Sequence, residues 1–182
     1  MQNLTDKILS CSKCEGLNCL ANKTLSSPGY GNPKSKVIFY GSSVGGSGMT
    51  RVIPFASGSG KIIDKILKQA EVKKDDIYIS NIVKCRLPNL RSPKESELKN
   101  CEDFAREEIK IIKPDIIVPM GSIATKLLLG KSVTLSKVVY QEFEVQGVKV
   151  IPMYHPAYIM RGIGDKEKYF NKMIELCKYA NG

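Results

Sequence analysis

The chain has 182 residues, 42% of them hydrophobic, which suffices for one core without disulfides and is too short for two full domains. Lys and Arg outnumber Asp and Glu by 28 to 18, so the formal net charge of +10 favours a polyanionic partner. No apolar run approaches the twenty or so residues that span a bilayer, and residues 1–10 lack the apolar core of a signal peptide. We therefore expect one domain, residues 1–182, in the cytoplasm and without a membrane partner.

Short apolar runs alternate with amphipathic stripes along the chain. Strands are predicted at residues 37–40, 77–79 and 116–118. Helices are predicted at residues 61–70, from a capping-box sequence at 92–95 to Pro114, and at 121–130. A strand pair follows at residues 138–145 and 148–153, and a last helix at residues 165–179. This order predicts a three-layer α/β/α fold with a central, mostly parallel, four-stranded sheet.

Four segments follow the predicted strands, and ligands of such sheets bind beyond the carboxyl ends of the strands. These segments are residues 41–55, 80–91, 119–122 and 154–161. We therefore expect the functional site in these loops.

The six cysteines are expected to be reduced thiols in the cytoplasm, so their spacing is informative. Cys11 and Cys14 form a Cys-x-x-Cys pair, while Cys85 and Cys101 are separated by fifteen residues. Four thiolates at this spacing favour an iron–sulfur cluster, with zinc as the alternative. Core burial is the competing interpretation for the second pair. Cys19 has no assigned role, and Cys177 is expected to pack on the last helix.

Five motifs occur in a characteristic order along almost the whole chain. They are Cys11-x-x-Cys14, Pro54-Phe55, residues 81–101 from Asn81 to Cys101, Gly121-Ser122-Ile123-Ala124, and residues 154–161. In this order and spacing the chain resembles the family-four uracil-DNA glycosylases. The resemblance implies a base excision repair enzyme that flips out uracil or another deaminated base and hydrolyses its glycosidic bond in DNA. It also implies a structural [4Fe–4S] cluster on Cys11, Cys14, Cys85 and Cys101, which holds the N-terminal segment.

Three residues are expected to handle the flipped base. Phe55 offers an apolar face for stacking, although it is also a common type of core residue. The amide of Asn81 can donate to and accept from the edge of uracil, or it can cap a loop. The ring of His155 can donate to uracil O2 as negative charge develops there, although a lone histidine is usually structural.

Other residues are expected to contact DNA around this pocket. Helix openings and basic residues would bind phosphates, and two apolar residues are candidates for a wedge that fills the gap left by the base. The phosphate contacts are Ser57, Ser59, Lys61, Ser122, Arg86, Arg91 and Arg161, and the wedge candidates are Ile159 and Met160. Ordinary helix starts and core packing are the competing interpretations.

The first loop departs from the family pattern. Ser42 follows Gly41 where the family has an acidic residue that positions water, and Gly41 and Ser43 line the pocket beside it. A serine cannot act as a carboxylate base. We expect weakened uracil excision, altered base choice in a roomier pocket that admits thymine, or loss of activity. The alternative functions are a catalytically weak or inactive relative that binds damaged DNA, and a redox-sensing iron–sulfur protein. The protein is expected to be a monomer.

Overall fold

The computed structural model describes residues 1–17, 26–45, 55 and 58–182, and these contain one mixed six-stranded sheet in the order β1-β3-β2-β4-β6-β5. The strands are β1 (Tyr30–Gly31), β2 (Val37–Val44), β3 (Tyr78–Arg86), β4 (Ile116–Pro119), β5 (Phe143–Val145) and β6 (Val148–Val150). The four central strands run parallel, as predicted, whereas β1 and β5 are antiparallel at the two edges. The prediction of four strands is therefore wrong in number, because two short edge strands extend the parallel set.

The strand pair near residue 145 is shorter than predicted. Residues 138–142 do not continue β5, since α5 (Leu135–Val138) precedes it and the chain turns at Tyr140, where φ is 68°. Gln146 and Gly147 form the expected two-residue turn with positive φ values of 53° and 79°. Beyond β6, Pro152 has no N–H for a ladder bond.

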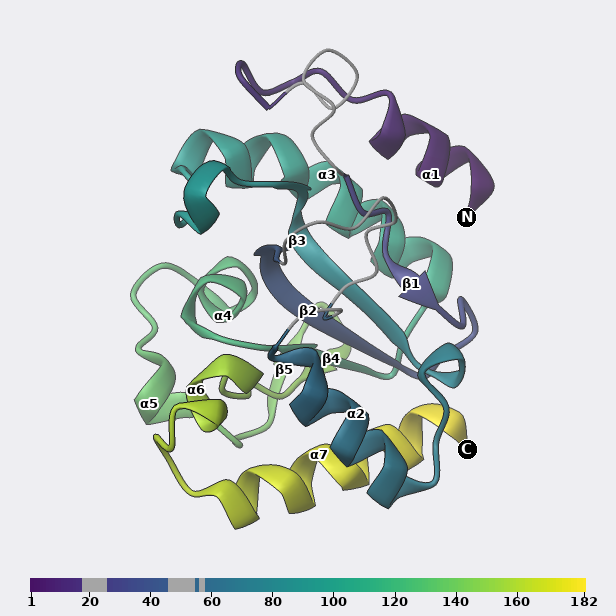
Figure 1. Ribbon diagram of the computed structural model, residues 1–182. Coiled ribbons are helices and arrows are strands. Elements are labelled where there is room, and N and C mark those ends of the chain that lie inside the picture. The colour runs from purple at the N-terminus through teal and green to yellow at the C-terminus, as the bar shows by residue number, and fades with distance from the viewer. Residues whose placement is uncertain (18–25, 46–54, 56–57) are drawn as a thin grey trace.

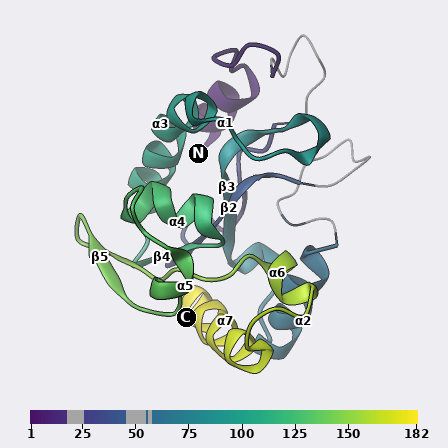
Figure 2. The ribbon, with the colours of Figure 1, turned by 90° about the vertical axis from the view of Figure 1, so that its left-hand side faces the viewer.

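Helices cover both faces of the sheet, so the three-layer prediction is confirmed (Figures 1 and 2). The remaining helices are α1 (Gln2–Leu9), α2 (Gly60–Ala70), α3 (Glu95–Ile112), α4 (Ser122–Leu129), α6 (Pro156–Met160) and α7 (Lys166–Asn181). One apolar core lies between the sheet and α2, α6 and α7. A second lies between the sheet and α3 and α4, and a third joins α1 to β3 and α3.

The helices predicted from periodicity are present, and α3 differs from its prediction only at its start. Its N-cap is Lys94, two residues after the expected capping serine. The carboxylate of Glu97 accepts from the Lys94 N–H at 2.7 Å and from the Arg91 guanidinium at 2.9 Å. Among the described residues, no helix is long and apolar enough to cross a bilayer.

Candidate functional site

The carboxyl ends of the parallel strands bring all four of the predicted loops together. Gly41 on β2 is the register partner of Asn81 on β3. The N–H of Met120, just after β4, donates to the carbonyl of Tyr40 at 2.8 Å. Gly121 then donates to Met153 at 2.8 Å, and a Cβ on Gly121 would lie 3.3 Å from the Cβ of His155. Segments that are far apart in sequence therefore meet at the carboxyl ends of the parallel strands.

Phe55 reaches the same place from the start of α2. A Cβ built on Gly41 would lie 2.3 Å from Oδ1 of Asn81 and 3.0 Å from Cζ of Phe55. The rings of Phe55 and His155 have centroids 5.5 Å apart. The backbone of Phe55 has a φ of 58°, and its carbonyl approaches Gly60 so closely that a Cβ there would lie 1.8 Å away. Gly60 therefore allows the turn that presents Phe55.

Asn81 is a buried residue, only 3% exposed, and its amide lies beside Gly41. Within the described part of the chain, no side-chain or backbone group hydrogen-bonds to this amide. Among the described residues, the only polar side-chain atoms that are fully buried without a partner are the hydroxyls of Tyr140 and Tyr169, so the Asn81 amide is not fully enclosed. Its two donors and its carbonyl are therefore available to a ligand that enters beside Gly41.

His155 is the N-cap of α6, and its Nδ1 accepts the N–H of Ala157 at 3.2 Å. This hydrogen bond assigns the proton of the neutral ring to Nε2. Burial, and then the charge of Arg161, hold the pKa of His155 below its ordinary value of 6.5. The ring is therefore a neutral donor through Nε2–H at neutral pH.

Ser42 and Ser43 follow Gly41 on β2 and are half-buried. No acidic residue occurs in the sequence from Gly41 to Gly60. The pocket residues named above are also free of carboxylates, so no general base is evident on this loop.

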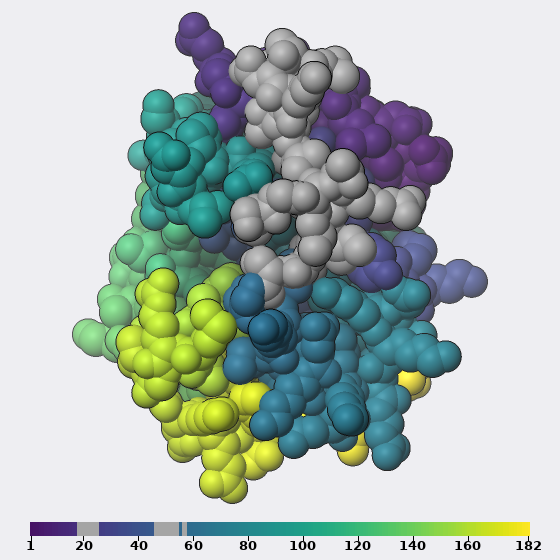
Figure 3. Space-filling model, in the orientation of Figure 1, coloured from purple at the N-terminus to yellow at the C-terminus, as the bar shows by residue number. Residues whose placement is uncertain are grey.

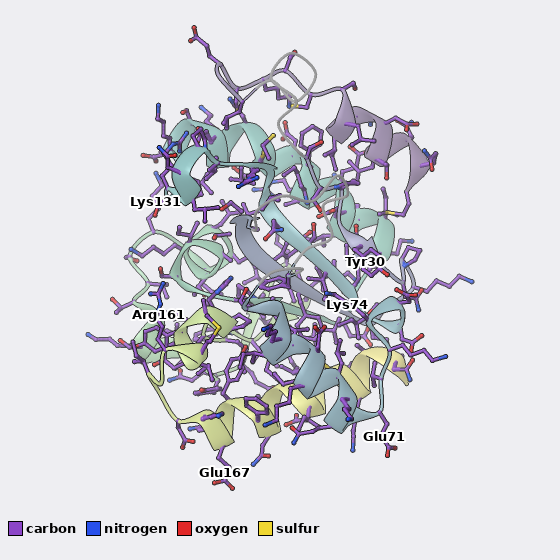
Figure 4. The ribbon with its side chains drawn as sticks, in the orientation of Figure 1. Tyr30, Glu71, Lys74, Lys131, Arg161 and Glu167 are labelled. Atoms are coloured by element: carbon purple, nitrogen blue, oxygen red, sulfur yellow. The ribbon has the colours of Figure 1, made fainter. Side chains whose placement is uncertain are left out.

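The candidate DNA contacts divide into exposed and buried side chains. Lys61, Ser122 and Arg161 are exposed, and Ser59 and Arg86 are half-buried. Figure 4 labels Arg161 at the end of α6. Ser57, like Cys19 and Pro54, lies outside the described residues. Arg91 is already bound by Glu97 and by the carbonyl of Ser92, so its guanidinium has less capacity for a phosphate.

The two wedge candidates on α6 differ sharply. Ile159 is 3% exposed and belongs to the core on the α2 and α7 side, which matches the competing interpretation of core packing. Met160 is 53% exposed and faces the start of α2, where its Sδ and Cε would lie 3.9 Å from a Cβ on Gly58. Figure 3 shows α2 and α6 adjoining on one face of the molecule.

The four predicted ligand cysteines gather in the core that joins α1, β3 and α3. Cys85 and Cys101 are buried there, and Cys11 and Cys14 pack against them. The side chain of Asn100 donates to the Lys13 carbonyl at 2.9 Å and to Cys14 Sγ at 3.5 Å, which ties the Cys-x-x-Cys segment to α3. Cys177 is buried on α7, where burial raises its pKa to about 12.

A buried ionic network was not predicted from the sequence. Lys84 and Glu108 form an ion pair in which both side chains are at most 1% exposed. Glu108 lies at a core position of the α3 stripe, between Ala105 and Ile112. Two features of the sequence could have predicted this pair, namely a carboxylate on the apolar stripe of a helix and a lysine inside an apolar strand.

The chain is similar to proteins of known family. A family model described as the uracil DNA glycosylase superfamily matches residues 28–178. A type-4 uracil-DNA glycosylase of Archaeoglobus fulgidus is 33% identical over 97% of this chain and 94% of its own length. One from Thermotoga maritima is 32% identical over 88% of this chain and 83% of its own length. A DNA polymerase of Bacillus phage SP01 is 35% identical over 57% of this chain but only 11% of its own length. The chain belongs to the uracil-DNA glycosylase superfamily and, within it, to the type-4 uracil-DNA glycosylases.

Proposed function

We propose that this protein is a DNA repair hydrolase that flips uracil out of DNA and cleaves its N-glycosidic bond. The observation that carries the proposal is the convergence of Gly41, Phe55, Asn81 and His155 from three of the loops that follow the strands. Together they offer a stacking face, an amide without a partner and a neutral imidazole donor, which is what recognition of an extruded pyrimidine requires. Relatives that cover almost the whole chain carry the same activity in their names.

In this proposal each group has one task. The flipped base stacks on Phe55, and Asn81 reads its O4 and N3–H edge. The close approach of Gly41 to Asn81 and Phe55 provides the wall against which the base rests. As the bond breaks, Nε2–H of His155 donates to O2, where the negative charge accumulates.

The chemistry depends on the departing base, because the loop from Gly41 to Gly60 supplies no carboxylate to activate water. Ser42 stands at the head of this loop and would at most orient a water molecule. Bond cleavage through a positively charged sugar needs a stabilised leaving group more than a strong nucleophile. The absence of bulky and acidic residues between Gly41 and Gly48 also favours a pocket that admits thymine and other deaminated bases.

Single-turnover excision tests this function on single-stranded and duplex DNA that contains uracil, with U·A, U·G and T·G pairs. We expect uracil to be released, with a rate at least tenfold lower in both Asn81→Ala and His155→Ala. Thymine release from the T·G pair is expected for a roomy pocket, and its complete rejection would contradict that part of the proposal. Tight binding of uracil-containing DNA without release would instead indicate a non-catalytic relative.

Around the pocket, the exposed Lys61, Ser122 and Arg161 would contact phosphates, together with Ser59 and Arg86. The exposed Met160 would fill the space left by the flipped base.

Cys11, Cys14, Cys85 and Cys101 would hold a [4Fe–4S] cluster. Support comes from the donor set, which is four thiols in one core, and from the Asn100 donor to Cys14. In the described residues, no three metal-ligating side chains meet closely enough to hold a single ion. Such a cluster would act structurally, by joining the N-terminal segment to β3 and α3.

Iron content and visible absorbance of the purified protein test the cluster. We expect about four irons per chain from the proposed cluster type, with loss of both signals in Cys85→Ala. Cys177→Ala, which changes a buried cysteine outside this core, is the matched control and should keep both. A colourless protein that contains stoichiometric zinc would show that the four cysteines bind zinc and not a cluster. Reversible reduction that changes DNA affinity would support a redox role.

A further inference from the structure

The carboxylate of Glu108 is buried at the centre of a hydrogen-bond network that no step above has used. It accepts from the hydroxyls of Tyr40 at 2.8 Å, Tyr78 at 3.1 Å and Ser80 at 3.0 Å, and from Nζ of Lys84 at 2.5 Å. Lys84 also donates to Ser80 at 2.8 Å. We call these five residues the Glu108 network. Each of the five side chains has at least one partner within the network.

The network joins three elements that the active site depends on. Tyr40 comes from β2, Glu108 comes from α3, and the other three residues come from β3. Burial, and then the charge of Glu108, raise the pKa of Tyr40 and of Tyr78, so both phenols remain protonated donors. One carboxylate on α3 therefore fixes two neighbouring strands at once.

Three of the four strand members of the network directly precede functional residues. Tyr40 precedes Gly41, and Ser80 precedes Asn81. Lys84 precedes the candidate ligand Cys85, while α3 carries Cys101 as well as Glu108. Successive side chains of a strand point to opposite faces, so Ser80 holds β3 from one face while Asn81 serves the other.

Stability alone does not account for such a pair. Burying two charges requires their desolvation, and well-packed neutral residues often replace a buried ion pair without loss of stability. Fixed geometry is the property that an ion pair with four further hydrogen bonds supplies. A pocket in which a methyl group on Gly41 would collide with Asn81 depends on such placement.

We infer that Glu108 and Lys84 are positioning residues for base excision, which hold the ends of β2 and β3 so that Gly41 and Asn81 meet the flipped base. This inference rests on the proposed function, since it assigns the placement of the base-reading amide to a buried ion pair on the opposite face of the sheet.

The test uses the full chain with the paired substitution Lys84→Met and Glu108→Gln. This variant removes both charges together, nearly keeps the volume and leaves a carboxamide whose oxygen and NH2 can hydrogen-bond to the hydroxyls, so no unpaired charge is buried. The matched control is Lys7→Met with Glu107→Gln, which removes a 2.9 Å ion pair that also reaches α3 but is half-exposed. The measurements are single-turnover uracil excision at varied enzyme concentration, thermal unfolding and iron content.

We expect the Lys84 and Glu108 variant to unfold within a few degrees of wild type and to keep its iron and its half-saturating enzyme concentration. Its rate at saturation should fall at least tenfold, while the control retains the wild-type rate. A purely structural pair would lower the unfolding temperature and leave the saturating rate of the folded fraction unchanged, and that result would overturn the inference.

Ser80→Ala provides a second variant if the paired substitution fails to fold. It removes one hydroxyl beside Asn81, and we expect a saturating rate at least threefold lower with unchanged unfolding. An unchanged rate in Ser80→Ala would overturn the inference. Failure of wild type to release uracil would overturn the proposed function itself, whereas equal rates in wild type and variants would overturn only the positioning role.

Discussion

At Gly41 the backbone of β2 runs so close to Asn81 and Phe55 that no side chain fits between them. In Gly41→Ala the new methyl group would displace the Asn81 amide or the Phe55 ring from the base. Misplacement of a binding group by about 1 Å lowers rates on the order of 100-fold. We expect a loss of this size in single-turnover uracil excision, with little change in the unfolding temperature.

The matched control is Gly182→Ala, where the new Cβ would make only an ordinary 3.6 Å contact with the Lys178 carbonyl. If Gly41→Ala excised uracil at the wild-type rate, the Asn81 amide would not read the base from its present position.

The only histidine of the chain is expected to titrate below its ordinary pKa. Burial disfavours the charged ring, so between the folded pKa and about 6.5 the unfolded chain binds more protons than the folded one. His155 therefore lowers the free energy of unfolding as pH falls through that range, and contributes no pH dependence above it. The NMR shifts of the ring protons should give a midpoint below 6.5.

The charge of Arg161 is the second cause of the lowered pKa of His155. Arg161→Gln should therefore raise the midpoint of the His155 titration only part of the way to its ordinary value. Arg106→Gln is the control, because Arg106 pairs with Glu102 on α3. A wild-type midpoint above 6.5 would contradict the buried, neutral ring.

At the scale of elements, the short helix α6 combines three tasks in five residues. His155 caps its first turn from the preceding position, Ile159 packs against the core, and Met160 is exposed. Sequence periodicity could not tell which of Ile159 and Met160 is buried, because two adjacent apolar residues look alike in so short a helix. The packing of the helix against the core decides this.

Substitution of these neighbours should separate stability from DNA repair. Ile159→Ala should lower the free energy of unfolding by roughly 2–5 kcal/mol, as for other large-to-small changes in a core. Met160→Ala should leave stability nearly unchanged and reduce excision from duplex DNA more than from single-stranded DNA, because only the duplex needs a wedge. Denaturant unfolding measures the stability of both variants, and single-turnover excision from duplex and single-stranded DNA measures their activity. Equal losses on the two DNA forms would exclude Met160 as the wedge.

For the whole molecule, the formal charge of +10 predicts DNA binding that weakens steeply with salt. Each phosphate contact contributes about 0.9 to the slope of log affinity against log salt concentration on duplex DNA. Arg161→Gln should reduce this slope by about one contact, whereas Arg106→Gln should not change it. Fluorescence anisotropy at several salt concentrations measures the slope, and equal slopes for wild type and Arg161→Gln would remove Arg161 from the DNA contacts.

The sequence by itself determined the order of the main elements, because periods of two and 3.6 residues report which face of an element is buried. It also determined the family, since five motifs occur in order. The edge strand β1 was not predicted, because its two residues carry no periodicity, whereas β5 lies within the strand predicted at residues 138–145.

Only the tertiary structure decided which side chains from distant segments meet. It paired Arg91 with Glu97, buried Ile159 beside an exposed Met160, and brought Phe55 to His155. It also placed Lys84 against Glu108 in the core between β3 and α3. Such partners are set by strand register and helix docking, which depend on the packing of the whole chain and leave no local pattern in the sequence.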